Sequence, residues 1–441
     1  MCHNRLTPRI SRDIFMFFNM IYDLRETGLV AAAAALQTIV VGGGAAGMMA
    51  AISAARSGRK VALLEGNSQL GRKILISGNG RCNLTNLDAD SPHHYHGERP
   101  EFVRRTLASF PLARSLEFFH ALGIETKQEK RGRLFPRSDQ ARSVVDLLID
   151  ELAVSGVRVA TDAKAVRLSR RGNGFSLVTR EGDEWLAERV ILASGGVSLP
   201  KLGADASGLA LAQGLGHTAT PLLPGLVPLE SSDRFARRMQ GVKVWAEVSA
   251  PVSKSHLVTD TDDLLLTKYG VSGFTILNLS AQLVPALERG PVELRVNLFS
   301  GQSPEQVSER LRERWARQPH RTLELSFAGL LASKITGPLL DKLKLSREQI
   351  VDTISKAQRW LLAQTLTAWP IVVTGPRSFD YAEVTIGGIR TDEVDPVTLE
   401  SRLVPGLFLA GEMLDVHGDL GGYNFQWAWS SGAVAGQGLL S

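Results

Sequence analysis

A glycine-rich hexapeptide that begins at Gly42 has the residue types of a phosphate-binding turn. It reads Gly-Gly-Gly-Ala-Ala-Gly and fits the pattern G-x-G-x-x-G. In this pattern Gly42 makes a tight turn, Gly44 lets the backbone approach a pyrophosphate, and Gly47 allows close packing of a helix on a strand. Ala45 and Ala46 lead into the expected helix, whose free N–H groups and dipole attract phosphate. The hexapeptide therefore predicts a dinucleotide-binding turn.

The segments around this turn have the order of a βαβ unit. Residues 38–41 and 60–64 are short apolar runs typical of buried parallel strands, and the small residues of 48–56 predict a helix between them. Glu65 follows the second run, where a carboxylate accepts hydrogen bonds from a ribose. The hexapeptide alone is a weak signal, but strand, turn, helix, strand and acid together strongly favour dinucleotide binding.

Later glycine clusters indicate that the dinucleotide is FAD. Residues 190–193 predict a strand that ends before a Ser-Gly-Gly sequence, and residues 406–410 predict another that ends in Gly411-Glu412. A late strand ending in Gly-acid is typical of FAD proteins with a glutathione-reductase-like fold. A helix expected to begin near Asn424 would direct its N-terminus at the flavin, where reduction builds negative charge. No second G-x-G-x-x-G with a trailing acid is visible, which argues against a separate nicotinamide domain.

Three longer segments, 71–86, 132–139 and 411–429, closely resemble the bacterial BaiN/RdsA (YhiN-like) flavoprotein family. The resemblance extends from about Thr38 to the C-terminus. It implies an α/β fold: a Rossmann-like, glutathione-reductase-like FAD-binding domain with an inserted β-barrel-like domain and a small helical subdomain. The expected organisation is a poorly ordered extension (1–37), an FAD-binding domain in two segments (38–200 and 374–441), a β-barrel-like insert (201–302 and 365–373) and a helical subdomain (303–364).

Within the insert, residues 226–297 have a strand-like pattern, and Ser303-Pro304-Glu305 is a plausible start for the helices. The chain departs from the family pattern at Lys268, where many members have His, and at Phe274, where many have Pro. Ala206-Ser207-Gly208 stands where many members have Gly-Asp-Gly. These departures point to a different substrate or rate, while the FAD motifs are intact.

The cofactor-binding residues come from the glycine turns, the C-terminal motif and the basic segment after Gly71, which is expected to be a loop over the flavin. Arg72, Lys73 and Arg81 can meet phosphate oxygens or an anionic flavin, although a solvated basic loop is the alternative. The residues expected to bind FAD are Gly42, Gly44, Ala45, Ala46, Gly47, Glu65, Arg72, Lys73, Ser77, Gly78, Asn79, Arg81, Gly195, Gly196, Gly411, Glu412, Asp415, Gly422, Asn424 and Gln426.

Two residues are candidate proton donors. Cys82 follows Arg81, whose charge is expected to lower the pKa of the thiol; the alternative is a small buried apolar residue. His417 lies within the C-terminal motif and could donate a proton or contact substrate, or it could be a surface loop residue. A thiol–disulfide relay would need Cys2, which lies in the extension. The neighbouring His93, His94 and His96 lack a completing ligand pattern, so no metal is expected.

The composition restricts the expected cellular location and binding partners. The 441 residues carry a net charge of +5 and only two cysteines, which favours a reducing, cytoplasmic location. The apolar runs at 14–22 and 29–36 are too short to span a bilayer, so no stable membrane association is expected. Basic residues in 127–142 and 310–321 are solvated faces or phosphate contacts with RNA. Composition does not determine the oligomeric state.

The predicted function is FAD-dependent oxidoreduction. The family resemblance implies NAD(P)H as the transient reductant and reduction of a C=C bond, with uridine of large-subunit ribosomal RNA, or a ribosomal precursor, as the leading substrate. In that reaction hydride from flavin N5 reaches uracil C6, and Cys82 or His417 protonates C5. The alternatives are a reductase of unsaturated small molecules, an amine oxidase of the aminoacetone type, and a non-catalytic FAD-binding protein.

Overall fold

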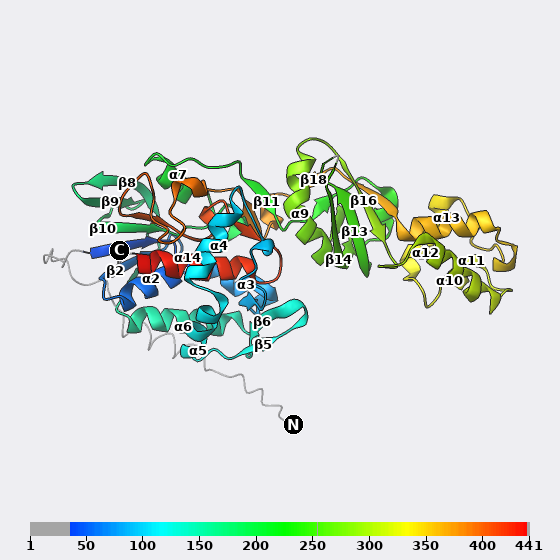
Figure 1. The fold of residues 1–441 in the computed structure, drawn as a ribbon, viewed down its shortest axis with the longest axis horizontal. Coiled ribbons are helices and arrows are strands. Elements are labelled where there is room, and N and C mark those ends of the chain that lie inside the picture. The colour runs from blue at the N-terminus through cyan, green and yellow to red at the C-terminus, as the bar shows by residue number, and fades with distance from the viewer. Residues whose placement is uncertain (1–35, 254, 439–441) are drawn as a thin grey trace, which may run out of the picture.

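The computed structural model describes residues 36–253 and 255–438. Figure 1 shows an elongated molecule, with a first sheet and its helices at one end, a second sheet in the middle and a group of helices at the other end. The expected extension lies outside the described residues except for Leu36 and Gln37, which already belong to strand β1 (Leu36–Val41). No helix of the described ranges is long and apolar enough to cross a membrane.

The first sheet is built on parallel strands, of which β1, β2 and β20 are mostly buried. Its order is β7-β2-β1-β10-β9-β8, and β20 pairs with β10. The strands β7, β2, β1, β10 and β20 are parallel, whereas β9 and β8 extend the sheet in antiparallel fashion. The strands beyond β1 are β2 (Val61–Leu64), β7 (Arg158–Ala160), β8 (Ala165–Arg171), β9 (Gly174–Thr179), β10 (Glu184–Leu192) and β20 (Leu407–Leu409).

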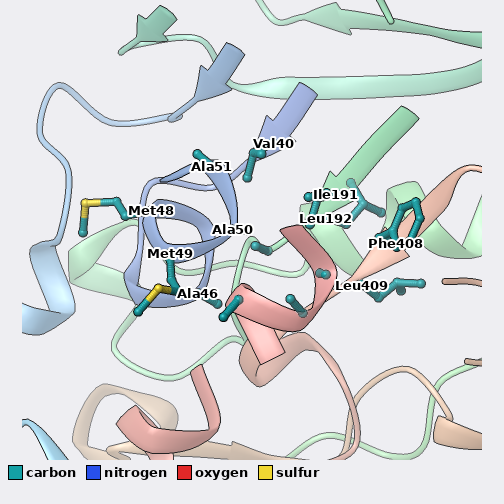
Figure 2. Packing of buried hydrophobic residues seen from close by; sticks show 14 of the residues in the cluster. Val40, Ala46, Met48, Met49, Ala50, Ala51, Ile191, Leu192, Phe408 and Leu409 are labelled. Carbon is teal, nitrogen blue, oxygen red and sulfur yellow. The ribbon is translucent and has the colours of Figure 1, made fainter. Parts of the chain in front are cut away.

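Helix α2 (Ala45–Arg56) packs on this sheet, and α14 (Tyr423–Gln437), from the opposite end of the chain, packs on α2. A Cβ atom on Gly432 would lie 2.3 Å from the Ala46 carbonyl oxygen, so only glycine permits this backbone approach. Figure 2 shows apolar side chains of α2 and, to one side of it, those of β1, β10 and β20 in the same buried cluster. The other helices of this end are α3 (Arg72–Gly80), α4 (Pro100–Ser109), α5 (Leu112–Ala121), α6 (Ala141–Val154) and α7 (Ser207–Gln213).

The second sheet is antiparallel throughout, with the order β17-β16-β13-β14-β15-β12-β18. One continuous segment, 369–376, pairs with both β16 and β12, so the two edges of the sheet are joined by the same short stretch of chain. The strands are β12 (Leu229–Glu230), β13 (Lys243–Pro251), β14 (Leu257–Leu266), β15 (Gly270–Ser272), β16 (Val292–Asn297), β17 (Trp369–Val373) and β18 (Gly375–Pro376).

The expectation of strand throughout residues 226–297 is wrong at two places. Helix α8 (Arg234–Arg238) and the longer α9 (Phe274–Leu287) interrupt it. The α9 sequence is so uniformly apolar that it has no clear period, and such a run is compatible with a buried helix as well as with a strand. Because one side of the sheet needs an apolar cover, α9 packs against β14 and is buried there.

The second sheet continues into a group of helices, and the two share one apolar cluster. As predicted, the first helix begins after Ser303, whose hydroxyl accepts a hydrogen bond from Gln306 N while the Gln306 side chain accepts from Ser303 N. The helices are α10 (Pro304–Ala316), α11 (Leu323–Ser326), α12 (Ser333–Leu343) and α13 (Lys356–Thr367).

Short ribbons join distant parts of the chain beside the first sheet. Strand β4 (Tyr95–His96) pairs with β21 (His417–Gly418), and β11 (Leu223–Gly225) pairs with β19 (Val384–Ile386). A three-stranded ribbon contains β3 (Thr85–Asn86), β6 (Arg133–Pro136) and β5 (Thr126–Gln128). The pairing of β3 with β6 joins the first two long motifs, and hydrogen bonds of Thr85 with Gln426 and of Asn86 with Gly421 join the third to them.

Candidate functional site

The glycine turn has the geometry that its sequence predicts. Gly42 has a φ of +106°, and a Cβ on Gly47 would lie 1.7 Å from the Gly42 carbonyl oxygen. Gly44 caps the N-terminus of α2 and has nothing within 4 Å of the position where a Cβ would be. The turn is closed on the protein side at Gly47 and open at Gly44, which suits a phosphate group above the first turn of α2.

Glu65 lies at the carboxyl end of β2 and joins three segments. One of its carboxylate oxygens accepts a hydrogen bond from Gly43 N at 2.7 Å, and the other accepts from Asn67 N at 2.8 Å. The Asn67 side-chain oxygen in turn accepts from the Arg72 guanidinium at 2.6 Å. Glu65 is therefore held beside the glycine turn, in the position expected for ribose recognition.

Glu412 is held by three polar groups from distant segments. Lys73 Nζ lies 2.8 Å from one of its oxygens, and the other accepts from Ser198 Oγ at 3.0 Å and Thr385 N at 2.9 Å. Burial would raise the pKa of Glu412, but the charge of Lys73 and these hydrogen bonds outweigh it and hold the pKa below its usual value. Lys73, expected to meet phosphate, is thus used to stabilise a protein carboxylate.

The two arginines expected at phosphate also have protein partners. Arg72 donates to Asn67 and to the Lys201 carbonyl oxygen. Arg81 lies 2.7 Å from Glu129, and its guanidinium lies 4.3 Å from the centre of the Phe135 ring. These contacts leave a phosphate role for the arginines without support in the geometry, because their donors are already directed at protein acceptors.

The segment after Gly71, expected to be a loop, begins as helix α3. The helical geometry ends at Ser77, and Gly78 and Asn79 take left-handed conformations with φ values of 56° and 59°. A Cβ on Gly78 would lie 2.9 Å from the Phe135 ring. The helix positions Lys73 toward Glu412, and the left-handed pair turns the chain into the buried stretch that contains Cys82.

Cys82 does not have the environment expected for an acidic thiol. Its side chain is fully buried, and burial raises the pKa to about 12 despite a hydrogen bond with Ser77. Arg81 does not lower this value, since its guanidinium is directed at Glu129 and Phe135. The predicted direction of the pKa shift is wrong, because desolvation dominates at this position. Cys82 is a buried thiol in the core.

His417 is buried rather than on a surface loop, with 4% of its area exposed. Neither ring nitrogen has a hydrogen-bond partner in the structure. Burial lowers its pKa to about 3, with a further contribution from His96, so the ring is neutral at ordinary pH. A buried polar group without a partner is costly and marks a place where a ligand can supply the missing contact.

The residues of the C-terminal motif mainly hold the backbone around α14 in place, and few of them have polar atoms left to bind a cofactor. Gly422 has a φ of 107° and caps α14, which begins at Tyr423 as predicted for a helix near Asn424. The Asn424 amide holds the backbone N–H and carbonyl of Gly418, both at 2.8 Å. Asn424 therefore fixes the approach to α14, and a direct cofactor contact has no support from its bonds.

Two further expected ligands are also satisfied by protein groups. Asp415 is buried, accepts from Glu98 N at 3.1 Å, and has a pKa raised by burial. The Gln426 amide accepts from Thr85 and donates to Ser115 and Ser430, so all its side-chain atoms are used in the core. Both residues fix the elements around the site, and neither presents a free polar atom to a ligand.

Sequence reasoning missed three residues around Glu412. Ser198 and Thr385 form hydrogen bonds with its carboxylate. Glu383 directly precedes β19, and its carbonyl oxygen accepts from Ser198 Oγ at 3.3 Å. Desolvation by the surrounding protein raises the pKa of the Glu383 carboxyl to about 7. A Thr-Ile-Gly-Gly sequence stands at residues 385–388, and its paired glycines were the available signal.

Two arginines of the expected basic surface at 127–142 contact the part of the protein that contains the second sheet. Arg131 Nε lies 2.9 Å from Asp262 Oδ2 on β14, and the Arg133 guanidinium lies 5.1 Å from the centre of the Phe274 ring on α9. Phe274, a departure from the family pattern, therefore contacts the three-stranded ribbon through Arg133 of β6. Lys268, the other departure, is exposed.

The polar groups left open fit a bound dinucleotide. Gly44 and Gly195 both have free space where a side chain would be. Ser194 Oγ and Asn83 Oδ1, like the ring of His417, are buried without partners. A cofactor with phosphate, hydroxyl and carbonyl groups can satisfy such atoms, so the residues present are compatible with FAD.

The HI0933-like protein Rossmann domain family matches residues 36–438. The chain belongs to this family. A 3-dehydro-bile acid delta(4,6)-reductase of Clostridium scindens is 39% identical over 88% of this chain and 95% of its own length. A ribosomal RNA dihydrouridine synthase of Escherichia coli is 33% identical over 88% of this chain and 94% of its own.

These relatives confirm the family predicted from the three motifs, and membership identifies the chain as a flavin-dependent oxidoreductase with an FAD-binding Rossmann-like domain. Among solved structures, 3-ketosteroid delta1-dehydrogenase from Sterolibacterium denitrificans superposes with a TM-score of 0.50 at 13% identity, covering 92% of this chain and 100% of the other. This likeness supports the predicted α/β fold class for this HI0933-like protein.

Proposed function

We propose that this protein is an FAD-dependent reductase of a C=C bond conjugated to a carbonyl group. The observation that carries the proposal is the shared chemistry of two relatives with unrelated substrates, a bile acid and a ribosomal RNA. A delta(4,6)-reductase of a 3-dehydro bile acid and a dihydrouridine synthase both saturate a C=C bond next to a carbonyl. This chain covers at least 94% of each of these proteins.

Such a reduction needs a hydride on one carbon and a proton on the other. Bound FAD, reduced by NAD(P)H, supplies the hydride. In our proposal the open turn at Gly44, together with Gly195 and Glu65, holds the dinucleotide. His417 is the proposed proton donor, because it is the buried candidate with unused nitrogen atoms.

For the substrate, uridine in large-subunit ribosomal RNA or its precursor remains our first candidate. It is supported by the dihydrouridine synthase relative and by the net charge of +5. The 39% identity with the bile acid reductase favours a second candidate, a small unsaturated ketone. A cytoplasmic location suits either substrate and is part of the same proposal.

One experiment compares the two substrates directly. The purified protein is loaded with FAD, reduced with NADPH or NADH, and mixed anaerobically with either deproteinised large-subunit rRNA or an unsaturated 3-ketosteroid. Reoxidation of the flavin and formation of the saturated product are measured. The rRNA assignment requires dihydrouridine at a defined position, and its loss when the gene is deleted. Product from neither substrate would contradict the proposed function.

The oxygen electrode provides a separate check on reaction class. An amine oxidase would consume oxygen and form peroxide with an amine such as aminoacetone. We expect no amine-dependent oxygen uptake above the slow reaction of reduced flavin with oxygen. Uptake that depends on the amine would replace C=C reduction by amine oxidation.

A further inference from the structure

A chain of hydrogen bonds leads from the protein surface toward His417. The Asp419 carboxylate accepts from both sides, with Oδ2 at 2.9 Å from His94 Nδ1 and Oδ1 at 2.7 Å from His96 Nε2. The other ring nitrogen of His94 lies 2.8 Å from Asp88 Oδ2. Asp88 is the most exposed member of this chain, with 67% of its side chain accessible against 25–29% for the other three.

The pairing of β4 with β21 places His417 next to the inner end of this chain. His96 and His417 are directly opposite each other in the ribbon, and their ring centres are 5.4 Å apart. The charges of His96, Asp419 and Glu412 all act on the pKa of His417, so its ring is near both the chain and Glu412. It is the point where the two groups of residues meet.

The outer members of the chain are held in an orientation that suits proton transfer. His94 is stacked on the Tyr423 ring at 4.2 Å, which fixes the orientation of its two nitrogens toward Asp88 and Asp419. Hydrogen bonds and charge from Asp419 and Asp88 outweigh burial and raise the pKa of His94, while its histidine partners hold the pKa of Asp419 low. Both shifts favour an ion pair between the His94 imidazolium and the Asp419 carboxylate.

We propose that Asp88, His94, Asp419 and His96 form a path that conducts protons from solvent to His417. The proposal rests on the reductase function above and identifies how its proton donor is recharged. The substrate carbon gains a C–H bond as one N–H bond of His417 breaks. The other His417 nitrogen takes a proton from His96, which must act as an imidazolium because its Nε2–H already donates to Asp419. No hydrogen bond joins the two rings, whose centres are 5.4 Å apart, so a water molecule carries this proton across the gap. Asp419 and His94 pass one proton inward, and water at Asp88 replaces it.

This order of proton transfers is suited to a buried histidine that stays neutral. Because one nitrogen accepts as the other donates, the His417 ring carries no lasting charge in a site that disfavours it. The two electrons come from NAD(P)H through the bound flavin, so one NAD(P)H and one proton are consumed for each C=C bond reduced. The charged or titratable groups facing the path are Glu412 at its inner end and Tyr423 and Asp88 at its outer end.

The test measures proton exchange rather than turnover. In the full chain with oxidised FAD bound and ¹⁵N-labelled histidine, NMR follows the exchange of ring N–H hydrogens with deuterated solvent. Ring exchange at His417 is expected to be slowed about tenfold or more by Asp419→Asn and by His96→Gln, because a buried N–H without the path must wait for local opening. His217, buried and paired with Glu393 and Ser401, is the internal reference.

A matched pair of variants tests the solvent end of the proposed proton path. His94→Gln interrupts the path, whereas His93→Gln changes an exposed neighbour that lies outside it. We expect slower His417 exchange only in the first. Unchanged exchange at His417 in Asp419→Asn, His96→Gln and His94→Gln would overturn the path, whichever substrate the enzyme reduces. Slowed exchange in an enzyme that reduces no C=C bond would support the path while refuting the proposed function.

Discussion

The site has two parts that are built differently. The turn from Gly42 to Gly47 with Glu65 consists of backbone N–H groups, open space and one carboxylate held by local groups. The part around Glu412 consists of side chains that bind one another across hundreds of residues, as Lys73 does. The first part is defined by backbone conformation and the second by long-range pairing, so substitutions should damage them in different ways.

The contrast also separates binding from chemistry. A backbone turn can hold phosphate with almost any surroundings, because its donors are fixed by φ and ψ. A proton donor depends on burial and on each neighbouring charge, so its behaviour cannot be separated from its partners. We therefore expect changes in the turn to act on the fold or on FAD affinity, and changes around Glu412 and His417 to alter pH dependence.

The largest effect is expected from Gly47→Ala. A Cβ there would lie 1.7 Å from the Gly42 carbonyl oxygen, so backbone must move, at a cost of about 3 kcal/mol or more. Urea unfolding measures the loss of stability, and flavin absorbance of the purified protein measures the loss of FAD. Stability equal to that of the wild type would show that the turn is less tightly packed than the structure indicates.

Gly44→Ala is the matched control for that variant. Nothing in the protein lies within 4 Å of the added Cβ, so the fold should keep its stability in the absence of FAD. The methyl group would occupy space that a phosphate needs, and FAD affinity should fall by about tenfold or more. Titration of flavin-free protein with FAD gives this number, and unchanged affinity would place the pyrophosphate elsewhere.

A smaller effect is expected from Lys73→Met, which leaves Glu412 without its cation. The pair is partly screened by solvent, so we expect a loss of about 2 kcal/mol at neutral pH. The lowered pKa of Glu412 contributes stability that is present above its ordinary pKa and is lost as the pH falls through the lowered value. The difference between wild type and variant should therefore shrink in acid.

Unfolding by urea at neutral and acidic pH measures this difference. Lys60→Met, at an exposed lysine, controls for the loss of one positive charge. A loss in Lys73→Met that is no larger than that of the control would show that Glu412 is held by Ser198 and Thr385 alone.

The same division explains what the sequence could and could not predict. The turn, Glu65 and the start of α14 depend on neighbouring residues and on glycine, and the sequence predicted all of them. The ion pair of Lys73 with Glu412 spans 339 positions, so no local pattern contains it. The pKa of Cys82 was predicted in the wrong direction because the adjacent Arg81 was visible in the sequence, whereas burial and the turning of Arg81 toward Glu129 were not.

His417→Gln should change the pH dependence of stability. The folded pKa of His417 is lowered to about 3, so on going below its unfolded pKa the unfolded state binds a proton that the folded state does not. Wild-type stability from this residue is present above about pH 6.5 and is lost as the pH falls toward the folded value. At pH 5 the wild type should have lost about 2 kcal/mol that the variant does not lose.

Urea unfolding of the wild type and His417→Gln at pH 8 and pH 5 tests the direction of this change in stability. On acidification the free energy of unfolding should fall more in the wild type than in His417→Gln. His93→Gln should show no such difference from the wild type, because His93 is exposed. A constant difference between wild type and His417→Gln would mean that the ring is more accessible to solvent, and more easily charged, than its 4% exposure indicates.

The smallest effect is expected from Cys82→Ala. The buried Cys82 thiol can give its proton only from a single atom, whereas His417 can accept a proton on one nitrogen as it donates from the other. Removing one sulfur atom from a packed site costs about 1 kcal/mol. Reoxidation of reduced enzyme by substrate should keep nearly its wild-type rate in this variant, whereas it should fall about 100-fold in His417→Gln. Stopped-flow measurement of flavin absorbance compares the two at equal FAD content. The opposite ranking would return the proton-donor role to Cys82 and leave His417 as a buried positioning residue, because only the group that gives its proton to carbon slows this step when removed.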